Sequence, residues 1–323
     1  MFFFVQRERQ AEINNAFKDT SAYARTFAEH TTLTLKGLDQ IAIFLKYQAE
    51  RSGLNMDIPH FVNEARFGGQ PFVLLSIVNE TGELISSSQL PFVPANIKDR
   101  EHFIVHKATD IGPFISKPVL GRASGKWSIQ LSRRINKPDG SFGGVVVVSI
   151  DPYHFANFYR LLNLGENASI TLVGRDGIIR ARQSNADFGL GQDLHKRTEE
   201  ILASGNAGKY SDASMYDRVR RLYSFQALDE YPLVVIVGVA ETQVFQELNQ
   251  RIYHYYWICG GISIAILLFM AVLLADISRR KRAEEKLRQS EETFRYLTEN
   301  SSDIIWHLDK NFCFDYVSPA DER

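Results

Sequence analysis

The sequence predicts an α+β protein in which one long N-terminal helix precedes two antiparallel-sheet units and a membrane-spanning helix. Residues 6–52 contain no proline, and their apolar residues recur every three or four positions, as on one face of a helix. Two later blocks repeat the same order of strands, turns and helix. Residues 257–275 include no charged side chain. At ~1.5 Å per residue this segment spans roughly 28 Å, the thickness of a bilayer core.

The N-terminal residues are apolar but too few to cross a membrane. Residues 2–5 read FFFV, whereas a spanning helix needs about 20 residues. We interpret residues 1–5 as the stump of a first membrane helix whose beginning is missing. The long helix is predicted over residues 6–52, as one helix or two nearly collinear ones, and it ends at Ser52-Gly53.

The two sheet units are predicted at residues 53–155 and 156–245. Each opens with a hairpin, SIVNETGELI in the first and TLVGRDGII in the second. Each then continues with a helical patch, at 98–108 and 194–202, and with three further strands. We therefore expect two copies of a five-stranded antiparallel sheet. A single large β-sandwich is the alternative.

The strand predicted at residues 126–135 alternates between two faces. Its apolar positions are Trp127, Ile129 and Leu131, and its polar positions are Ser128, Gln130 and Ser132. Successive side chains of a strand point to opposite sides. The polar face therefore either lines a pocket or faces solvent.

The membrane helix is predicted over residues 253–276. Four basic residues follow it, Arg279, Arg280, Lys281 and Arg282, and such a cluster marks the cytoplasmic side. A helix buried in a soluble core is the alternative. The sheet units then lie on the outer side of the membrane. This outer portion contains no cysteine for disulfide bonds, which fits the periplasm of a bacterium better than a small secreted eukaryotic module.

A heptad spacing follows the membrane helix. Its positions are Ala283, Leu287, Ser290, Phe294 and Leu297, four and three residues apart in turn. We expect residues 277–298 to form a signalling helix that pairs two copies into a homodimer. Residues 299–323 begin another sheet, which the chain does not complete.

Composition and motifs exclude several functions. The formal net charge is −1, so no basic field favours nucleic acid. The motifs GxxxxGK[ST], GxSxG and GxGxxG are absent, and we expect no catalytic residue and no cofactor. His102 and His106 lie four apart on a predicted helix, a spacing compatible with a metal, but no third ligand is evident and no metal site is expected.

Several segments together resemble the tandem PDC, or double Cache, sensor domains of bacterial transmembrane receptors. They are residues 99–103 (DREHF), 115–135 (ISKPVLGRASGKWSIQLSRRI), 143–155 (GGVVVVSIDPYHF) and 172–182 (LVGRDGIIRAR). The resemblance covers roughly residues 10–245. Together these segments look like the Cache pairs that precede diguanylate cyclases and some histidine kinases. Residues 290–322 separately resemble the opening of a PAS domain.

This resemblance implies a small-molecule site in the first, membrane-distal unit. In amino-acid-binding members, an arginine shortly after an aspartate holds the ligand carboxylate, and Arg100 is the matching position. Where those members carry a Trp-Tyr pair, an acidic residue and a last-strand aspartate, this sequence has His102, Phe103, Val105 and Ser149. Because carboxylates that would hold an ammonium group are missing, we expect a carboxylate or another anion as the ligand.

The residue types add further candidates and alternatives. Arg100 can present a bidentate fork to a carboxylate, although a salt bridge to Asp99 or Glu101 is the alternative. Lys117 adds positive charge, whereas three arginines are expected on the solvated surface: Arg122, Arg133 and Arg134. Trp127 fits the core as well as a ligand platform. The candidate ligand-binding residues are Arg100, His102, Phe103, Lys117, Trp127, Gln130, Ser149 and Asp151.

The expected function is therefore ligand sensing across a bacterial inner membrane, with the C-terminus in the cytoplasm. The resemblance favours a diguanylate cyclase (GGDEF) output beyond residue 323, with a histidine kinase as the alternative. A chemoreceptor and a solute-binding transporter component are the less favoured classes. The partners expected are a small molecule, the lipid bilayer and a second copy of the chain.

Overall fold

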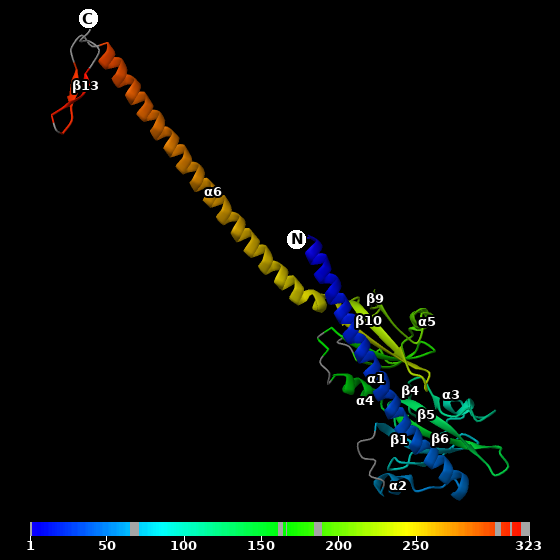
Figure 1. Cartoon of the computed structure of the whole chain (residues 1–323). Helices are drawn as coiled ribbons and strands as arrows, with labels where there is room; N and C mark the ends of the chain where they lie inside the picture. The colour runs from blue at the N-terminus through cyan, green and yellow to red at the C-terminus, as the bar shows by residue number, and fades with distance from the viewer. Residues whose placement is uncertain are drawn as a thin grey trace. The chain divides into compact units, whose positions relative to one another are not determined.

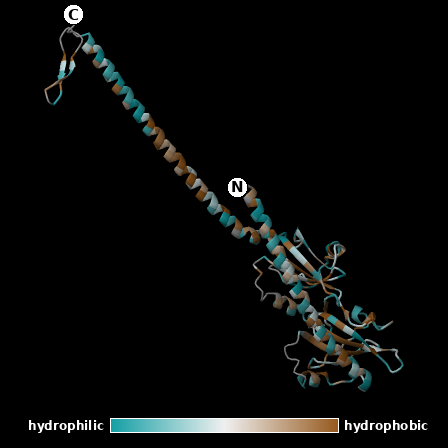
Figure 2. Ribbon diagram, viewed as in Figure 1, coloured by the Kyte–Doolittle hydropathy of each residue, from teal (hydrophilic) through white to brown (hydrophobic). Residues whose placement is uncertain are grey.

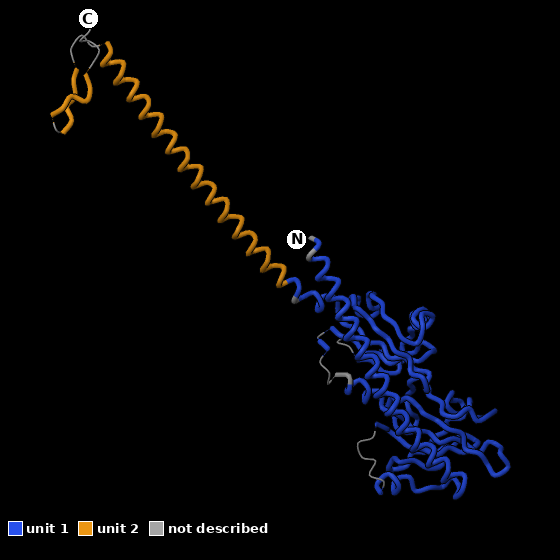
Figure 3. Tube along the Cα trace, viewed as in Figure 1, with its two compact units in different colours: residues 1–249 blue, residues 250–323 orange. Residues whose placement is uncertain are grey.

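The computed structural model describes residues 2–64, 71–160, 164–165, 167–183, 189–300, 305–310 and 312–317. The chain divides into two compact units, Met1–Asn249 and Gln250–Arg323 (Figure 3). The first unit contains the long N-terminal helix and two antiparallel sheets, and the second contains most of a long apolar helix and a short hairpin (Figure 1). The α+β class predicted from the sequence is confirmed.

The first unit is built on helix α1 (Phe2–Ser52), a single helix of 51 residues. The segment predicted as the stump of a first membrane helix is continuous with α1 from Phe2 onward, and its assignment to a membrane helix stays a prediction. Phe27, Leu38 and Leu45 are fully buried along one of its faces. They belong to one hydrophobic cluster that also contains residues from both sheets. The helix therefore supplies a shared core for the two sheets.

The first sheet has six strands rather than the expected five. They are β1 (Phe72–Asn79), β2 (Leu84–Ser87), β3 (Phe114–Ile115), β4 (Val119–Leu120), β5 (Trp127–Asn136) and β6 (Phe142–Ile150). Their order is β2-β1-β6-β5-β3, and β4 pairs with the beginning of β5. The sequence analysis missed β4 because two residues are too short to show alternation.

Two short helices accompany this sheet. Helix α2 (Ile58–Glu64) precedes β1, and α3 (Glu101–Ile104) lies between β2 and β3. The helix predicted at residues 98–108 is thus reduced to four residues, and hydrogen-bonded turns continue it as far as Lys107.

The second sheet repeats the strand order of the first. Its strands are β7 (Ser169–Gly174), β8 (Ile179–Gln183), β9 (Ala207–Ala213), β10 (Arg220–Ala227) and β11 (Leu233–Ala240), in the order β8-β7-β11-β10-β9. Helix α4 (Pro152–Arg160) precedes it, so the predicted unit boundary at residue 155 falls inside a helix. Helix α5 (His195–Ala203) lies between β8 and β9. The two sheets are separate and have corresponding strand orders, so the alternative of one large β-sandwich is wrong.

The hairpin glycines show how closely the two sheet units match. Gly82 and Gly177 both adopt positive φ, +87° and +77°, at the turn of the first hairpin. A side chain at Gly82 would collide with the backbone of Lys98, and one at Gly177 with the backbone of His195. In each unit the chain that leads toward the short helix therefore crosses directly over the hairpin turn, where only glycine fits.

Each sheet has one face toward α1 and one face away from it. On the first sheet, Ile129, Leu131 and Val148 join the cluster around α1. The alternating positions Gln130 and Ser149 are also buried, so they lie on the opposite face, beneath other parts of the unit. The polar face of β5 is therefore neither an exposed sheet face nor part of the helix-packed core.

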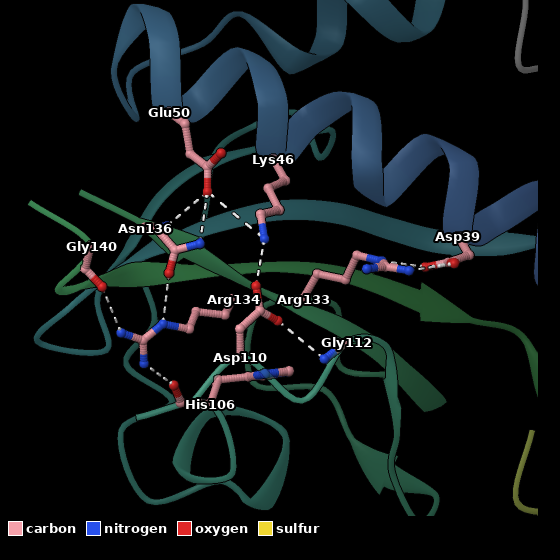
Figure 4. Close-up of polar contacts among 10 residues, drawn as sticks. All are labelled: Asp39, Lys46, Glu50, His106, Asp110, Gly112, Arg133, Arg134, Asn136 and Gly140. Carbon is pink, nitrogen blue, oxygen red and sulfur yellow. Dashed lines mark hydrogen bonds and ion pairs between the residues drawn. The ribbon is translucent and has the colours of Figure 1, made fainter. Parts of the chain in front are cut away.

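Polar contacts attach α1 to strand β5 and to the loop after α3 (Figure 4). Arg133 donates two hydrogen bonds to Asp39, of 2.6 and 2.7 Å. Lys46 donates to Asp110 at 2.8 Å, and the Asn136 amide donates to Glu50 at 2.9 Å. Arg134 is buried and donates to the His106 and Gly140 carbonyls. The expectation that Arg133 and Arg134 are solvated surface residues is therefore wrong.

The second unit contains most of helix α6 (Glu241–Glu299), in which the predicted membrane and signalling helices are continuous. Within the described residues, α6 alone is long and apolar enough to cross a membrane, and its apolar stretch is plain in Figure 2. Leu267 and Phe269 are 69% and 63% exposed, so no described part of the chain buries this stretch. Strands β12 (Trp306–Leu308) and β13 (Phe314–Val317) form a hairpin after α6. Its assignment to a PAS domain stays a prediction, and residues 318–323 lie outside the described residues.

Candidate functional site

A cleft lies over the polar face of the first sheet, with a cavity volume of about 50 Å³. Its polar lining residues are Ser76, Arg100, His102, Arg122, Ser124, Gln130 and Ser149. Its apolar walls include Leu74, Val78, Leu84, Ile97, Val119 and Val147. No aspartate or glutamate lines the cleft among the described residues, so its electrostatic character depends on the two guanidinium groups.

Arg100 is held at the start of α3, where it is the N-cap residue. Its guanidinium Nη2 donates to the Leu120 carbonyl at 3.1 Å, and no carboxylate in the described chain pairs with it. The neighbouring carboxylate of Asp99 instead accepts two hydrogen bonds from Arg122, of 2.6 and 2.7 Å. These bonds hold the pKa of Asp99 at about 2. The alternative of an Arg100 salt bridge to Asp99 or Glu101 is therefore wrong.

Arg122 lines the cleft and is exposed, as the sequence predicted for it. It lies after β4 and its Nη1 also donates to the Asn96 carbonyl at 2.6 Å, which joins the β4–β5 loop to the segment before α3. Because Asp99 neutralises Arg122, Arg100 supplies the uncompensated positive charge of the cleft. The sequence carries no local signal for this pairing, since Asp99 and Arg122 are brought together only by the folded loops.

His102 presents a second polar group to the cleft. Its side chain is buried, and its Nδ1 has no hydrogen-bond partner in the described part of the chain. Burial, together with the charge of Arg100, lowers the pKa of His102 to about 4. The imidazole is therefore neutral at pH 7 and can donate or accept a hydrogen bond at the cleft.

Gln130 and Ser149 form a buried network on adjacent strands. The Ser149 hydroxyl donates to Gln130 Oε1 at 2.7 Å, and Gln130 Nε2 donates to Ser128 Oγ at 2.8 Å. The strand register places Gln130 opposite Ser149. This network fixes the orientation of the Gln130 amide at the base of the cleft. Ser132, on the same face, instead pairs with His106 Nε2 at 3.0 Å.

The other four predicted residues do not line the cleft. Phe103 is fully buried in a cluster with Val147 and contacts Phe142 edge-on. Lys117 is exposed. Trp127 is 47% exposed at the first position of β5 and is not a core residue. Asp151 accepts a hydrogen bond from the Tyr153 amide at 2.9 Å and caps the start of α4. The structure thus brings together Arg100, His102, Gln130 and Ser149.

The arrangement is suited to binding an anion rather than to catalysis. A guanidinium without a carboxylate partner can form two parallel hydrogen bonds with a carboxylate. The described residues contain no group of three or more His, Cys, Asp or Glu side chains that could hold a metal ion.

The chain is similar to one known sensor family and to several solved sensor structures. Residues 152–238 match the dCache_1_like family, described as a histidine kinase sensor domain. The extracellular domain of the putative histidine kinase rpHK1S-Z16 is 28% identical, with a TM-score of 0.64. The match covers 71% of this chain and 95% of that domain. The first unit therefore has the fold of the double Cache sensor domains.

Two further structures share the double Cache fold at lower identity. An extracellular ligand-binding receptor from Desulfohalobium retbaense is 18% identical, with a TM-score of 0.52, and the match covers 67% of this chain and 39% of that one. The ligand-binding domain of Mlp24, solved with asparagine, is 14% identical, with a TM-score of 0.50 and coverage of 76% and 99%. No curated protein sequence gave a significant match. The first unit is thus similar to the extracellular sensor domains of histidine kinases.

Proposed function

We propose that this chain is the sensing and membrane-spanning part of a bacterial inner-membrane receptor that binds a small carboxylate. The observation that carries the proposal is the first-sheet cleft, in which Arg100 faces a lining without acidic residues. Amino acids bound by structures of the same fold, such as asparagine in Mlp24, also carry a carboxylate. An α-ammonium group, however, would find no carboxylate partner in this cleft. A carboxylate that lacks an amino group therefore fits best.

In the proposed complex the ligand carboxylate receives hydrogen bonds from the Arg100 guanidinium. The neutral His102 imidazole and the Gln130–Ser149 network are available to a second polar group of the ligand. The aliphatic walls, including Leu74, Val119 and Val147, would contact a short carbon chain. The ligand is thus a small organic acid, since a cleft of this size leaves little room for more.

Signal transfer is proposed to begin at strand β5. This strand carries Gln130 at the cleft and, three residues later, Arg133, which is paired with Asp39 of α1. The second sheet ends in β11, and α6 follows it directly. A ligand shifts such a receptor only by binding one conformation better than the other. We propose that the shift displaces or rotates α6, which spans the membrane and leads to a cytoplasmic C-terminus. This motion then changes the pairing of residues 283–297 in a homodimer.

A histidine kinase is the output that we propose. The family matched by residues 152–238 and the rpHK1S-Z16 domain both favour it, whereas the diguanylate cyclase rests on sequence resemblance and remains the alternative. Assays of the intact receptor separate the two: autophosphorylation from ATP identifies the kinase, and cyclic dinucleotide formation from GTP identifies the cyclase.

The ligand class is tested by calorimetry on the whole chain in detergent micelles, titrated with acetate, succinate, pyruvate and alanine. Arg100→Gln removes the charge and the fork, so we expect its Kd for the carboxylate bound by the parent to rise about 10- to 100-fold. Lys117→Gln is the matched control, because Lys117 is exposed and outside the cleft, and it should bind as the parent does. Unchanged affinity in Arg100→Gln, or tighter binding of alanine than of pyruvate, would contradict the proposal.

A further inference from the structure

The second sheet also has a cleft on its face away from α1, with a cavity volume of about 50 Å³. Ile170, Leu172 and Val235 pack toward α1, so the alternating positions Thr171 and Ile236, which line the cleft, point the other way. The strand register pairs Thr171 with both Ile236 and Arg182. Arg182 therefore lies on the cleft side, at its base.

Arg182 differs from the other deeply buried arginines of this sheet. Arg180 and Arg221 are 4% and 1% exposed, and each forms two hydrogen bonds with a carboxylate, that of Asp176 or Asp217. Arg182 is equally buried, at 4% exposed, yet within the described residues it has no carboxylate partner. Its Nε, like that of Arg180, has no hydrogen-bond partner there. Burying a guanidinium without a partner destabilises the folded chain. The same desolvation lowers the pKa of Arg182.

The charges around the cleft leave this guanidinium uncompensated. Arg197 and Asp212 also line the cleft and form an ion pair with each other, and Arg197 pairs in addition with Glu200, which lies outside the lining. Arg221, on the same face, is neutralised by Asp217 at 2.6 Å. The lining therefore has one excess positive charge, and Arg182 carries it.

Aromatic rings complete the cleft. The Arg182 guanidinium lies over the Tyr216 ring at 4.5 Å, and Tyr210 stacks on Tyr223 with ring centroids 5.0 Å apart. Gly238 makes room for this stack, since a Cβ there would lie 2.4 Å from the Tyr223 ring. The rings hold the guanidinium plane and offer flat apolar surfaces beside it.

We propose that this second cleft is a separate binding site for a small organic carboxylate, with Arg182 as its anion-binding residue and the tyrosines as walls for a flat carbon skeleton. The proposal goes beyond the first-sheet site, because it needs neither Arg100 nor any other residue of that cleft. The receptor would then have two carboxylate sites, one on each sheet.

The binding test uses the whole chain in detergent micelles with Arg100→Gln present, so that the first cleft is disabled. Benzoate, acetate and inorganic phosphate are titrated by calorimetry. We expect benzoate to bind, and Arg182→Met to raise its Kd at least tenfold, with a smaller rise for Arg182→Lys. Benzoate affinity that does not depend on Arg182, or phosphate binding without carboxylate binding, would overturn the proposal. Loss of the first-sheet site alone leaves this result unaffected.

A stability test separates a ligand-binding arginine from a structural one. Without ligand, Arg182→Met replaces an unpaired buried charge with an apolar chain of similar length, so its melting temperature should equal or exceed that of the parent. Arg221→Met is the matched control on the same face of the sheet. It leaves Asp217 without its partner and should melt several degrees lower. An equal loss in both variants would assign Arg182 a structural role and overturn the proposal.

Discussion

At the scale of single residues, the presence or absence of a hydrogen-bond or ion-pair partner decides whether a polar group is available to a ligand. Asp99 and Arg122 neutralise each other, and this leaves Arg100 available at the first cleft. His102 and His106 lie four residues apart. The Nδ1 atoms of both lack a partner in the described residues, but His106 also forms a hydrogen bond with Ser132 through its Nε2. Sequence spacing therefore identified a pair whose members have different environments.

The buried histidines predict an acid-sensitive fold. Burial lowers the pKa of both His102 and His106 to about 4, below the value of about 6.5 in an unfolded chain. The unfolded chain then binds more protons, so stability is complete above pH 6.5 and falls until about pH 4. Between pH 6.5 and 5 each histidine should remove up to about 2 kcal/mol.

Thermal unfolding of the whole chain in micelles at pH 7 and pH 5 measures this effect. Burial also lowers the pKa values of His30 and His154, so the parent should show the combined loss. His106→Gln keeps a hydrogen-bonding group beside Ser132 and removes one titrating site. We expect a smaller difference between the two pH values in this variant, and an unchanged difference would contradict the assignment.

At the scale of elements, α1 is joined to the first sheet by both apolar and polar contacts. Its buried stripe was predictable from three- and four-residue spacing. The pair of Asp39 and Arg133 was not, because the two residues are 94 positions apart. Side-chain exposure of 11% and 17% places this pair largely out of water, so it is expected to contribute more than a surface ion pair.

Removing the α1 side of this pair should weaken the fold. Asp39→Asn leaves the Arg133 guanidinium without its counter-charge, at a cost of about 1–3 kcal/mol. Lys36→Ala breaks the exposed pair with Glu230, 46% and 54% exposed, and serves as the control, with an effect below about 1 kcal/mol. The melting temperatures of the two variants are compared with that of the parent. A larger loss for Lys36→Ala would reverse this ranking.

At the scale of the whole molecule, the chain combines a unit of the double Cache fold with one candidate membrane helix in its described residues. Leu287 and Phe294 are exposed on α6, at positions of the predicted heptad seam. A parallel homodimer would bury both.

Cysteine cross-linking tests this pairing directly. The native Cys259 and Cys313 are replaced by serine, and Leu287→Cys is compared with Glu292→Cys, which lies opposite the seam in the heptad. Because core positions of a parallel coiled coil meet their counterparts, we expect disulfide-linked dimers from Leu287→Cys at least tenfold faster. Equal rates, or no cross-link at either position, would refute the predicted homodimer seam.

The sequence by itself determined the α+β class, the long helix, the doubled strand order and the apolar segment, because each depends on periodicity or on a continuous run of residues. It also identified Arg100, His102, Gln130 and Ser149, four residues that the structure places around one cleft. Only the tertiary structure decided that Phe103 is core, that Asp151 caps a helix, and that Arg122 belongs at the cleft. It also revealed Arg182 as a buried guanidinium without a carboxylate partner among the described residues. Periodicity reports which face a side chain occupies, whereas its partner and its exposure depend on segments that are distant in the sequence and meet only in the folded chain.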